Sequence, residues 1–223
     1  MATFFFGRLR PLRTNWLMLG MPLDASGRFA VAASAAFAVT GLLFEVSMTA
    51  QLRDLDGKPL LFVDVDGVIS LFGFPHQTAP PGRFHFVDGI SHCIGSDSGR
   101  RLKALHDRFE MIWATGWEEK ANEYLPHLLE LPDLDLPVLT FDGRATFGSA
   151  HWKIDAIDEY AGGRPAAWID DNLDERCERW ARERAAPTLL IQTEAATGIS
   201  DEHVERLLAW ADREGPTETP GPG

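Results

Sequence analysis

The stretch Leu60-Leu61-Phe62-Val63-Asp64-Val65-Asp66-Gly67 decides the fold of this chain. Its first four residues are apolar without polar alternation, which is typical of a strand buried on both faces of a parallel sheet. Ligands of open α/β sheets bind at the carboxyl ends of strands, where Asp64 and Asp66 stand. Two carboxylates so close together repel each other unless a cation or a shared proton intervenes. The stretch therefore indicates a divalent metal site.

Three later segments extend this pattern. An apolar run ends in Thr115 and Gly116, Lys153 opens an amphipathic segment, and a second apolar run ends in Asp170-Asp171. The chain order Asp-x-Asp-Gly, Thr, Lys, Asp-Asp resembles the haloacid dehalogenase-like (HAD) hydrolase superfamily over roughly residues 58–212. Receiver domains use similar residues, but their paired acids come first in the chain, whereas here they come last.

The resemblance implies a role for each of these residues in phosphoryl transfer. Asp64 would attack phosphorus and form an aspartyl-phosphate, and Asp66 would protonate the leaving oxygen and later accept a proton from water. Thr115, Gly116 and Lys153 would bind the phosphoryl oxygens, with Lys153 also tempering the repulsion among the carboxylates. Because the second acid is needed only for an oxygen leaving group, its presence favours a phosphatase over a dehalogenase. Phosphatase and phosphotransferase share this intermediate and are not separated by sequence.

The resemblance also implies Mg²⁺ as cofactor, since this ion takes hard oxygen ligands. The expected ligands are the Asp64 carboxylate, the Asp66 backbone carbonyl and one acid of the later pair. Asp171 is the favoured ligand, and Asp170 would lie next to the ligands without binding the metal itself. The sequence leaves the choice between the two acids open.

Each assignment has a structural alternative. Asp64 and Asp66 could be turn residues, Thr115 could be an ordinary hydroxyl at a strand end, and Lys153 could be a solvated lysine on a helix. Asp170 and Asp171 could cap the helix that follows, which is compatible with metal binding.

The fold class expected is α/β, a three-layer Rossmann-like (HAD) fold with a central parallel sheet, because predicted strands and helices alternate. The catalytic domain is placed at residues 48–213 and a disordered tail at 214–223. Residues 68–98 predict a small flap with a hairpin through 84–94, and no large cap. A strand is expected over 136–141.

Residues 1–47 do not fit this domain. Arg8, Arg10 and Arg13 precede an uncharged stretch, Phe29–Phe44, that is short for a membrane span and is not followed by a clear cleavage site. The leader is interpreted first as non-native or disordered, and otherwise as an export or anchoring signal or a packed helix. The expected compartment is the cytoplasm, with membrane or export only if the leader is a native signal.

The predicted function is an Mg²⁺-dependent phosphatase acting on a phosphorylated substrate of unknown identity. One alternative is a nucleic-acid end-processing phosphatase, since the Asp170-Asp171-Asn172 turn and the charged helix with Trp180 are similar to phosphatase domains of polynucleotide kinase-type repair enzymes. The net charge of −12 does not favour nucleic acid. Another alternative is a catalytically silent binding module. Oligomeric state is left open.

Two groups of cationic residues could contact a substrate. Arg100, Arg101 and Lys103 could form a basic rim, although a solvated helix face is preferred. His76, His85 and His92 lie in the predicted flap, where surface histidines are the preferred interpretation.

Overall fold

The computed structural model describes residues 57–75, 77–141 and 148–215. The predicted leader lies outside the described residues, as do His76 and residues 216–223 of the predicted tail. The last helix runs to Glu214, one residue into that tail.

The central sheet has four parallel strands in the order β5-β1-β6-β7. Their bounds are Leu60–Val63 for β1, Glu110–Trp113 for β5, Ala166–Asp170 for β6 and Thr188–Gln192 for β7. Strand β1 pairs in register with β5 on one side and β6 on the other. All four of its side chains are fully buried, as the unbroken apolar run predicts.

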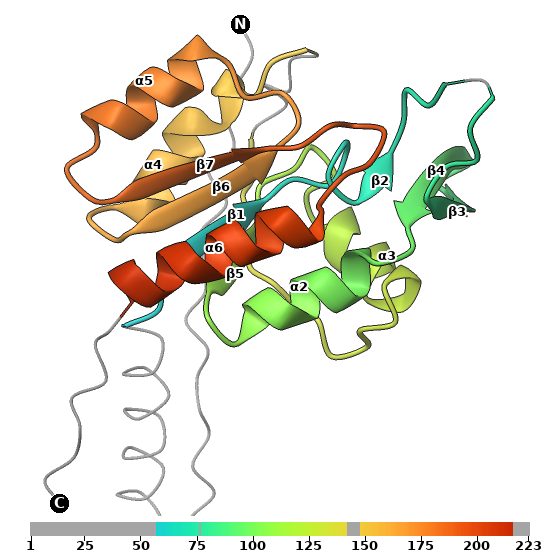
Figure 1. Cartoon of the computed structure of the whole chain (residues 1–223), viewed down its shortest axis with the longest axis horizontal. Coiled ribbons are helices and arrows are strands. Elements are labelled where there is room, and N and C mark those ends of the chain that lie inside the picture. The colour runs from blue at the N-terminus through green and yellow to red at the C-terminus, as the bar shows by residue number, and fades with distance from the viewer. Residues whose placement is uncertain (1–56, 76, 142–147, 216–223) are drawn as a thin grey trace, which may run out of the picture. The chain divides into compact units, whose positions relative to one another are not determined.

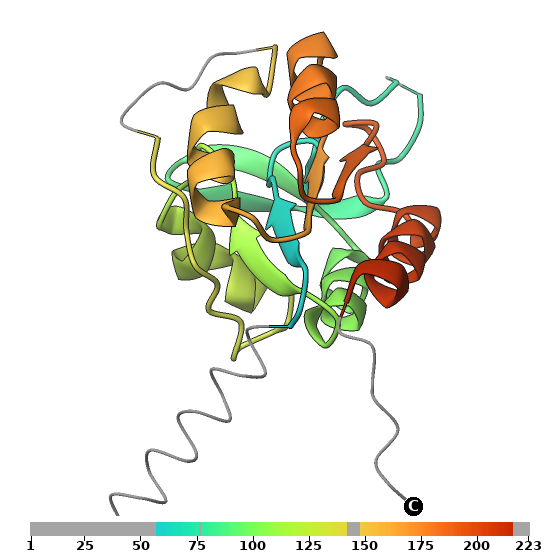
Figure 2. The same cartoon turned by 90° about the vertical axis from the view of Figure 1, so that its left-hand side faces the viewer.

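Helices cover both faces of this sheet (Figures 1 and 2). One layer holds α2, Ser98–His106, α3, Lys120–Leu128, and α6, Asp201–Glu214. The other holds α4, Ile154–Ala161, and α5, Glu175–Glu183, with the 3₁₀ turn η1, His151–Lys153, before α4. Alternate residues of β1 pack into the two layers, Leu61 and Val63 into the first and Leu60 and Phe62 into the second. The predicted three-layer α/β fold is confirmed.

A small antiparallel sheet, which we call the flap, lies between β1 and α2 in the chain. Its strands are β2, Ser70–Leu71, β3, Gly82–Val87, and β4, Ile90–Gly95, in the order β2-β4-β3. The predicted hairpin is formed by β3 and β4, and it turns at Asp88 and Gly89, both with positive φ. Tyr124 on α3 donates to the Asp88 carboxylate at 2.8 Å. The described residues between β1 and α2 hold this flap and loops, with no helical cap.

The prediction of a strand over 136–141 is wrong. The segment forms a single bridge, between Val138 and Trp113 of β5. The N–H of Trp113 donates to the carbonyl of Pro137 at 2.8 Å, and the N–H of Leu139 donates to the carbonyl of Trp113 at 2.9 Å. Pro137 itself has no N–H to contribute, which limits how far a ladder can extend at this edge.

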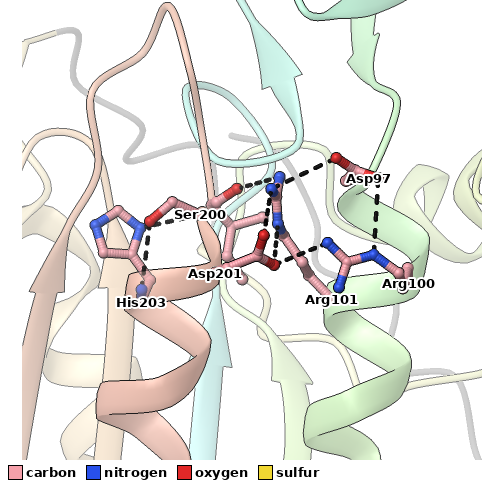
Figure 3. A network of polar contacts seen from close by, with 7 residues as sticks. Asp97, Arg100, Arg101, Ser200, Asp201 and His203 are labelled. Atoms are coloured by element: carbon pink, nitrogen blue, oxygen red, sulfur yellow. Dashed lines mark hydrogen bonds and ion pairs between the residues drawn. The ribbon is translucent and has the colours of Figure 1, made fainter.

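Ion pairs join α2 to α6 (Figure 3). Asp201 accepts from Arg100 at 2.8 Å and from Arg101 at 3.1 Å. Asp97 lies 3.7 Å from Arg100 and 3.5 Å from Arg101. Ser200 caps α6 in a reciprocal capping box with His203. Two of the three residues of the predicted basic rim are therefore paired with acids.

Candidate active site

The carboxyl ends of β1, β5 and β6 bring the predicted residues together. Asp64 directly follows β1, Thr115 lies two residues after β5, and Asp170 ends β6. Backbone hydrogen bonds extend the sheet up to this edge, because the N–H of Asp64 donates to the carbonyl of Ile169 at 3.1 Å. Residues more than 100 positions apart in sequence thus meet at one edge of the sheet, as the strand pattern predicts.

Gly67 allows the later acids to approach this edge. Its φ is +73°, which favours glycine, and a Cβ atom there would lie 2.3 Å from Cγ of Asp171. The loop that contains Gly67 is also held from the end of β7, since the hydroxyl of Thr193 donates to the carbonyl of Gly67 at 2.8 Å. The glycine of the Asp-x-Asp-Gly motif is therefore required for close packing against Asp171.

Lys153 lies buried between two carboxylates. Its Nζ is 2.7 Å from Oδ2 of Asp170 and 3.0 Å from Oδ1 of Asp64. Only 3% of the residue is exposed, so its interpretation as a solvated helix lysine is wrong. Burial alone would lower the pKa of Lys153, but Asp64 and Asp170 outweigh it and raise that pKa, which keeps the ammonium charged.

Three carboxylates form a group that could hold a metal. Asp64, Asp170 and Asp171 each offer an oxygen, and these oxygens all lie within 4.8 Å of one another. Hard oxygen donors in this number fit Mg²⁺. Both Asp170 and Asp171 line the cavity, but Asp170 is almost fully buried and already accepts from Lys153, whereas Asp171 is only half-buried. The side chain of Asp66 is not in this group, so its expected contribution through the backbone carbonyl stays a prediction.

Burial raises the pKa values of Asp64, Asp66 and Asp171. Burial raises the pKa of Asp64 to about 7, against the lowering effect of Lys153. Burial and the neighbouring Asp170 raise the pKa of Asp171 to about 6. Burial also raises the pKa of Asp66, although the Trp117 indole opposes the shift. Each of these groups would hold its negative charge more readily beside an added cation.

A cavity of about 520 Å³ opens over these groups. Gly116 and Trp117 line it, together with residues from four other segments: Asp64, Asp66, Phe72, Gly148, Ser149, Ala150, Trp152, Lys153, Asp170, Asp171 and Asn172. Thr115 is fully buried beside it, and its Oγ1 accepts from the N–H of Trp117 at 3.3 Å. All the residues predicted for the site are thus either at this cavity or directly behind it.

The helix after the paired acids is capped by a different residue. Asp174 accepts from the N–H groups of Arg176 and Cys177, so the capping role considered for Asp170 and Asp171 is wrong. Asp174 also binds Ser149 at 2.6 Å and His151 at 2.8 Å. These contacts fasten the segment before Lys153 to the start of α5.

Two residues lie at Asp66 that the sequence did not place there, although His92 was named as a flap residue that could contact a substrate. The indole Nε1 of Trp117 donates to Oδ2 of Asp66 at 3.0 Å. His92 lies 3.9 Å from Oδ1 of Asp66 with only 17% of its side chain exposed, so its interpretation as a surface histidine is wrong. The position of Trp117, just after Thr115-Gly116, was a signal that could have pointed to it.

Comparison with known families identifies the chain. The family model described as the HAD domain in Swiss Army Knife RNA repair proteins matches residues 60–204, more than half of the chain. The chain belongs to this family. Its HAD resemblance is thereby confirmed, and membership of the HAD superfamily supports a hydrolase. No curated protein matches the chain.

Solved structures resemble this HAD domain at low identity. The HAD domain of effector protein Lem4 from Legionella pneumophila is 15% identical, covers 70% of this chain and 97% of its own, and has a TM-score of 0.44. A hypothetical protein from Xanthomonas campestris is 16% identical over 73% and 86%, with a TM-score of 0.40. A HAD superfamily (subfamily III A) hydrolase from Legionella pneumophila is 17% identical over 77% and 93%, with a TM-score of 0.37.

No helix within the described ranges has the length and apolar character to cross a membrane.

Proposed function

We propose that this HAD domain is an Mg²⁺-dependent phosphatase that hydrolyses phosphoric monoesters through an aspartyl-phosphate on Asp64. The observation that carries the proposal is the buried contact of Lys153 with Asp64 and Asp170 beside the acid group that includes Asp171. A structural domain gains little from holding three acids and one lysine at a cavity, because burying charges costs free energy. Catalysis of phosphoryl transfer uses such an arrangement, because it depends on charged groups that are already in position.

The first half-reaction forms the intermediate. A carboxylate oxygen of Asp64 attacks phosphorus, the bond between phosphorus and the leaving oxygen breaks, and Asp66 gives its proton to that oxygen. Lys153 and the groups around Thr115 and Gly116 stabilise the negative charge on the phosphoryl oxygens. Asp64, Asp171 and the backbone carbonyl of Asp66 would hold Mg²⁺, which supplies further positive charge at these oxygens.

The second half-reaction restores the enzyme. Asp66, now unprotonated, takes a proton from a water molecule that attacks phosphorus. The bond between phosphorus and the Asp64 oxygen breaks, and inorganic phosphate leaves. Asp66 is protonated again and Asp64 is a free carboxylate.

Phosphate release by the full chain tests the proposal. The substrates are para-nitrophenyl phosphate, a panel of phosphorylated metabolites and oligonucleotides with 3′- or 5′-phosphates, each with Mg²⁺ and with EDTA. We expect release that requires Mg²⁺ and falls at least about 1,000-fold in Asp64→Asn, since a lost nucleophile removes the covalent route. Asp133→Asn, at an exposed turn, is the matched control and should keep wild-type activity. A folded wild type that binds Mg²⁺ but releases no phosphate would contradict the proposal and favour a binding role.

A phosphatase acting on nucleic-acid ends is the second candidate. It is favoured by the family description, which names RNA repair proteins. The net charge of −12 and the pairing of Arg100 and Arg101 with Asp201 count against it, because nucleic-acid enzymes collect phosphates with free cations. A kcat/KM for phosphorylated oligonucleotides well above that for mononucleotides, and falling steeply with salt, would select this candidate.

A further inference from the structure

Three side chains from outside the predicted motif residues surround Asp66. Trp117 donates its indole N–H to Oδ2 at 3.0 Å. His92 has its Nδ1 at 3.9 Å from Oδ1, and the same Nδ1 is 2.9 Å from Oγ of Ser70. The His92 and Trp117 rings pack edge to face with centroids 4.7 Å apart. Asp66 is thus held by the turn after β5 and by two strands of the flap.

The flap places these groups by strand register. Ser70 of β2 pairs with Ile94 of β4, and His92 lies two residues before Ile94 on the same strand. Side chains two residues apart on a strand share a face, so His92 and Ile94 point to the same side of the flap. Figure 1 shows the flap beyond the end of β1. Asp66 follows that strand by three residues, since β1 ends at Val63.

The contact with Trp117 selects an orientation of the acid. Half of the Asp66 side chain is exposed at the cavity, so without partners it would sample several rotamers. An indole N–H only donates, so the oxygen that receives it acts as an acceptor. In a protonated carboxyl group the carbonyl oxygen is the better acceptor, and the proton is therefore favoured on Oδ1.

We propose that Trp117 is a positioning residue for the acid step, and that His92 of the flap keeps the Trp117 indole in place. The inference rests on the proposed function, because it assigns Asp66 as the group that protonates the leaving oxygen. Trp117 fixes the carboxyl plane and the oxygen that carries the proton, so less orientational freedom has to be lost in the transition state. The flap then contributes to the reaction through His92, while Phe72, the residue directly after β2, lines the cavity.

The test compares two substrates whose leaving groups differ in whether they need a proton from Asp66. Para-nitrophenolate leaves without protonation, whereas an alkoxide does not, so we compare kcat/KM for para-nitrophenyl phosphate with kcat/KM for an alkyl phosphate. This ratio reports the first half-reaction only, up to departure of the leaving group. Trp117→Phe keeps a ring against His92 and removes the N–H. We expect it to lower kcat/KM for the alkyl phosphate by about 10-fold or more and for para-nitrophenyl phosphate by less than about 3-fold.

A matched control exists elsewhere in the chain. Trp180 on α5 also donates its indole N–H to an aspartate, Asp158, at 2.9 Å. Trp180→Phe removes the same kind of bond and should leave the ratio of the two substrates unchanged. His92→Ala should increase the ratio in the same direction as Trp117→Phe, and His92→Phe, which keeps a ring against the indole, should restore it toward wild type.

Three results would overturn the inference. Equal losses on both substrates in Trp117→Phe would mean that the indole supports the cavity or phosphate binding and not the acid. Unchanged values on both substrates would mean that the contact has no part in the reaction. A folded wild type that releases phosphate from neither of these substrates nor from any other in the phosphate-release assay would overturn the proposed function, and the inference with it.

Discussion

Two clusters of opposite charges stand in different surroundings in this molecule. Lys153 with Asp64 and Asp170 lies at the cavity floor with at most 9% of any side chain exposed. The pairs of Arg100 with Asp97 and Asp201 lie on the surface, with more than half of each side chain exposed (Figure 3). Water screens the second cluster and hardly reaches the first. The same pairing of charges therefore lies at the proposed catalytic site in one place, and in the other it joins two helices with little expected effect on stability.

The largest expected effect comes from removing the buried cation. Lys153→Met leaves Asp64 and Asp170 facing each other without an ammonium. We expect a loss of about 3 kcal/mol in the free energy of unfolding at neutral pH, because breaking a buried pair leaves uncompensated charge. Urea denaturation at pH 7.5 measures it, and the loss should shrink at pH 5, below the pKa of about 7 for Asp64, where that acid takes a proton. A variant as stable as wild type at both pH values would show that the cluster is not electrostatically coupled.

An intermediate effect is expected from Mg²⁺ and pH. The folded-state pKa values of about 7 for Asp64 and about 6 for Asp171 exceed the ordinary value of 3.8. Without a divalent cation, the stability contributed by these protons is therefore present below pH 4 and lost as pH rises toward 7. Mg²⁺ competes with the protons, so its stabilising effect should grow over the same range.

Thermal unfolding with Mg²⁺ or EDTA at pH 5 and pH 8 measures this linkage. We expect a larger rise in Tm with Mg²⁺ at pH 8 than at pH 5, and a smaller rise in Asp171→Asn. Equal shifts at both pH values, or equal shifts in wild type and variant, would place Mg²⁺ binding somewhere other than this acid group.

The smallest effect is expected at the surface cluster. Arg100→Ala removes exposed ion pairs that water already screens, so Tm and kcat/KM should both stay near the wild-type values. Thermal unfolding and the phosphate-release assay measure this side by side with Lys153→Met. A loss in Arg100→Ala comparable to that in Lys153→Met would remove the contrast between the two clusters.

The strand ends of the site were predictable because their signals are local. An apolar run that ends in Asp64 or in Asp170-Asp171 carries both the buried strand and its functional residues in one stretch. The burial of Lys153 was harder to predict, because the sequence at the start of an amphipathic helix is the same whether its lysine is solvated or buried. The placement of Lys153 depends on contacts of Asp174 with Ser149 and His151, and no local sequence pattern predicts these contacts.

The other incorrect predictions concern features that depend on contacts between distant segments or on single residues. His92 reaches Asp66 only because β4 is the central strand of the flap, and the pairing of that strand is not visible in the isolated motif. Asp174, three residues beyond Asp171, is the cap because the helix begins later than expected. The strand expected over 136–141 failed at Pro137, which cannot donate to a ladder.

The most direct test of the central claim is to look for phosphate on Asp64. The full chain is mixed with para-nitrophenyl phosphate and Mg²⁺, quenched in acid within the first turnovers, digested and analysed by mass spectrometry. The proposed mechanism predicts a phosphoryl adduct on the peptide that contains Asp64, absent in Asp64→Asn and in EDTA. Phosphate release without any adduct, persisting in Asp64→Asn, would contradict the covalent route and the role assigned to this carboxylate.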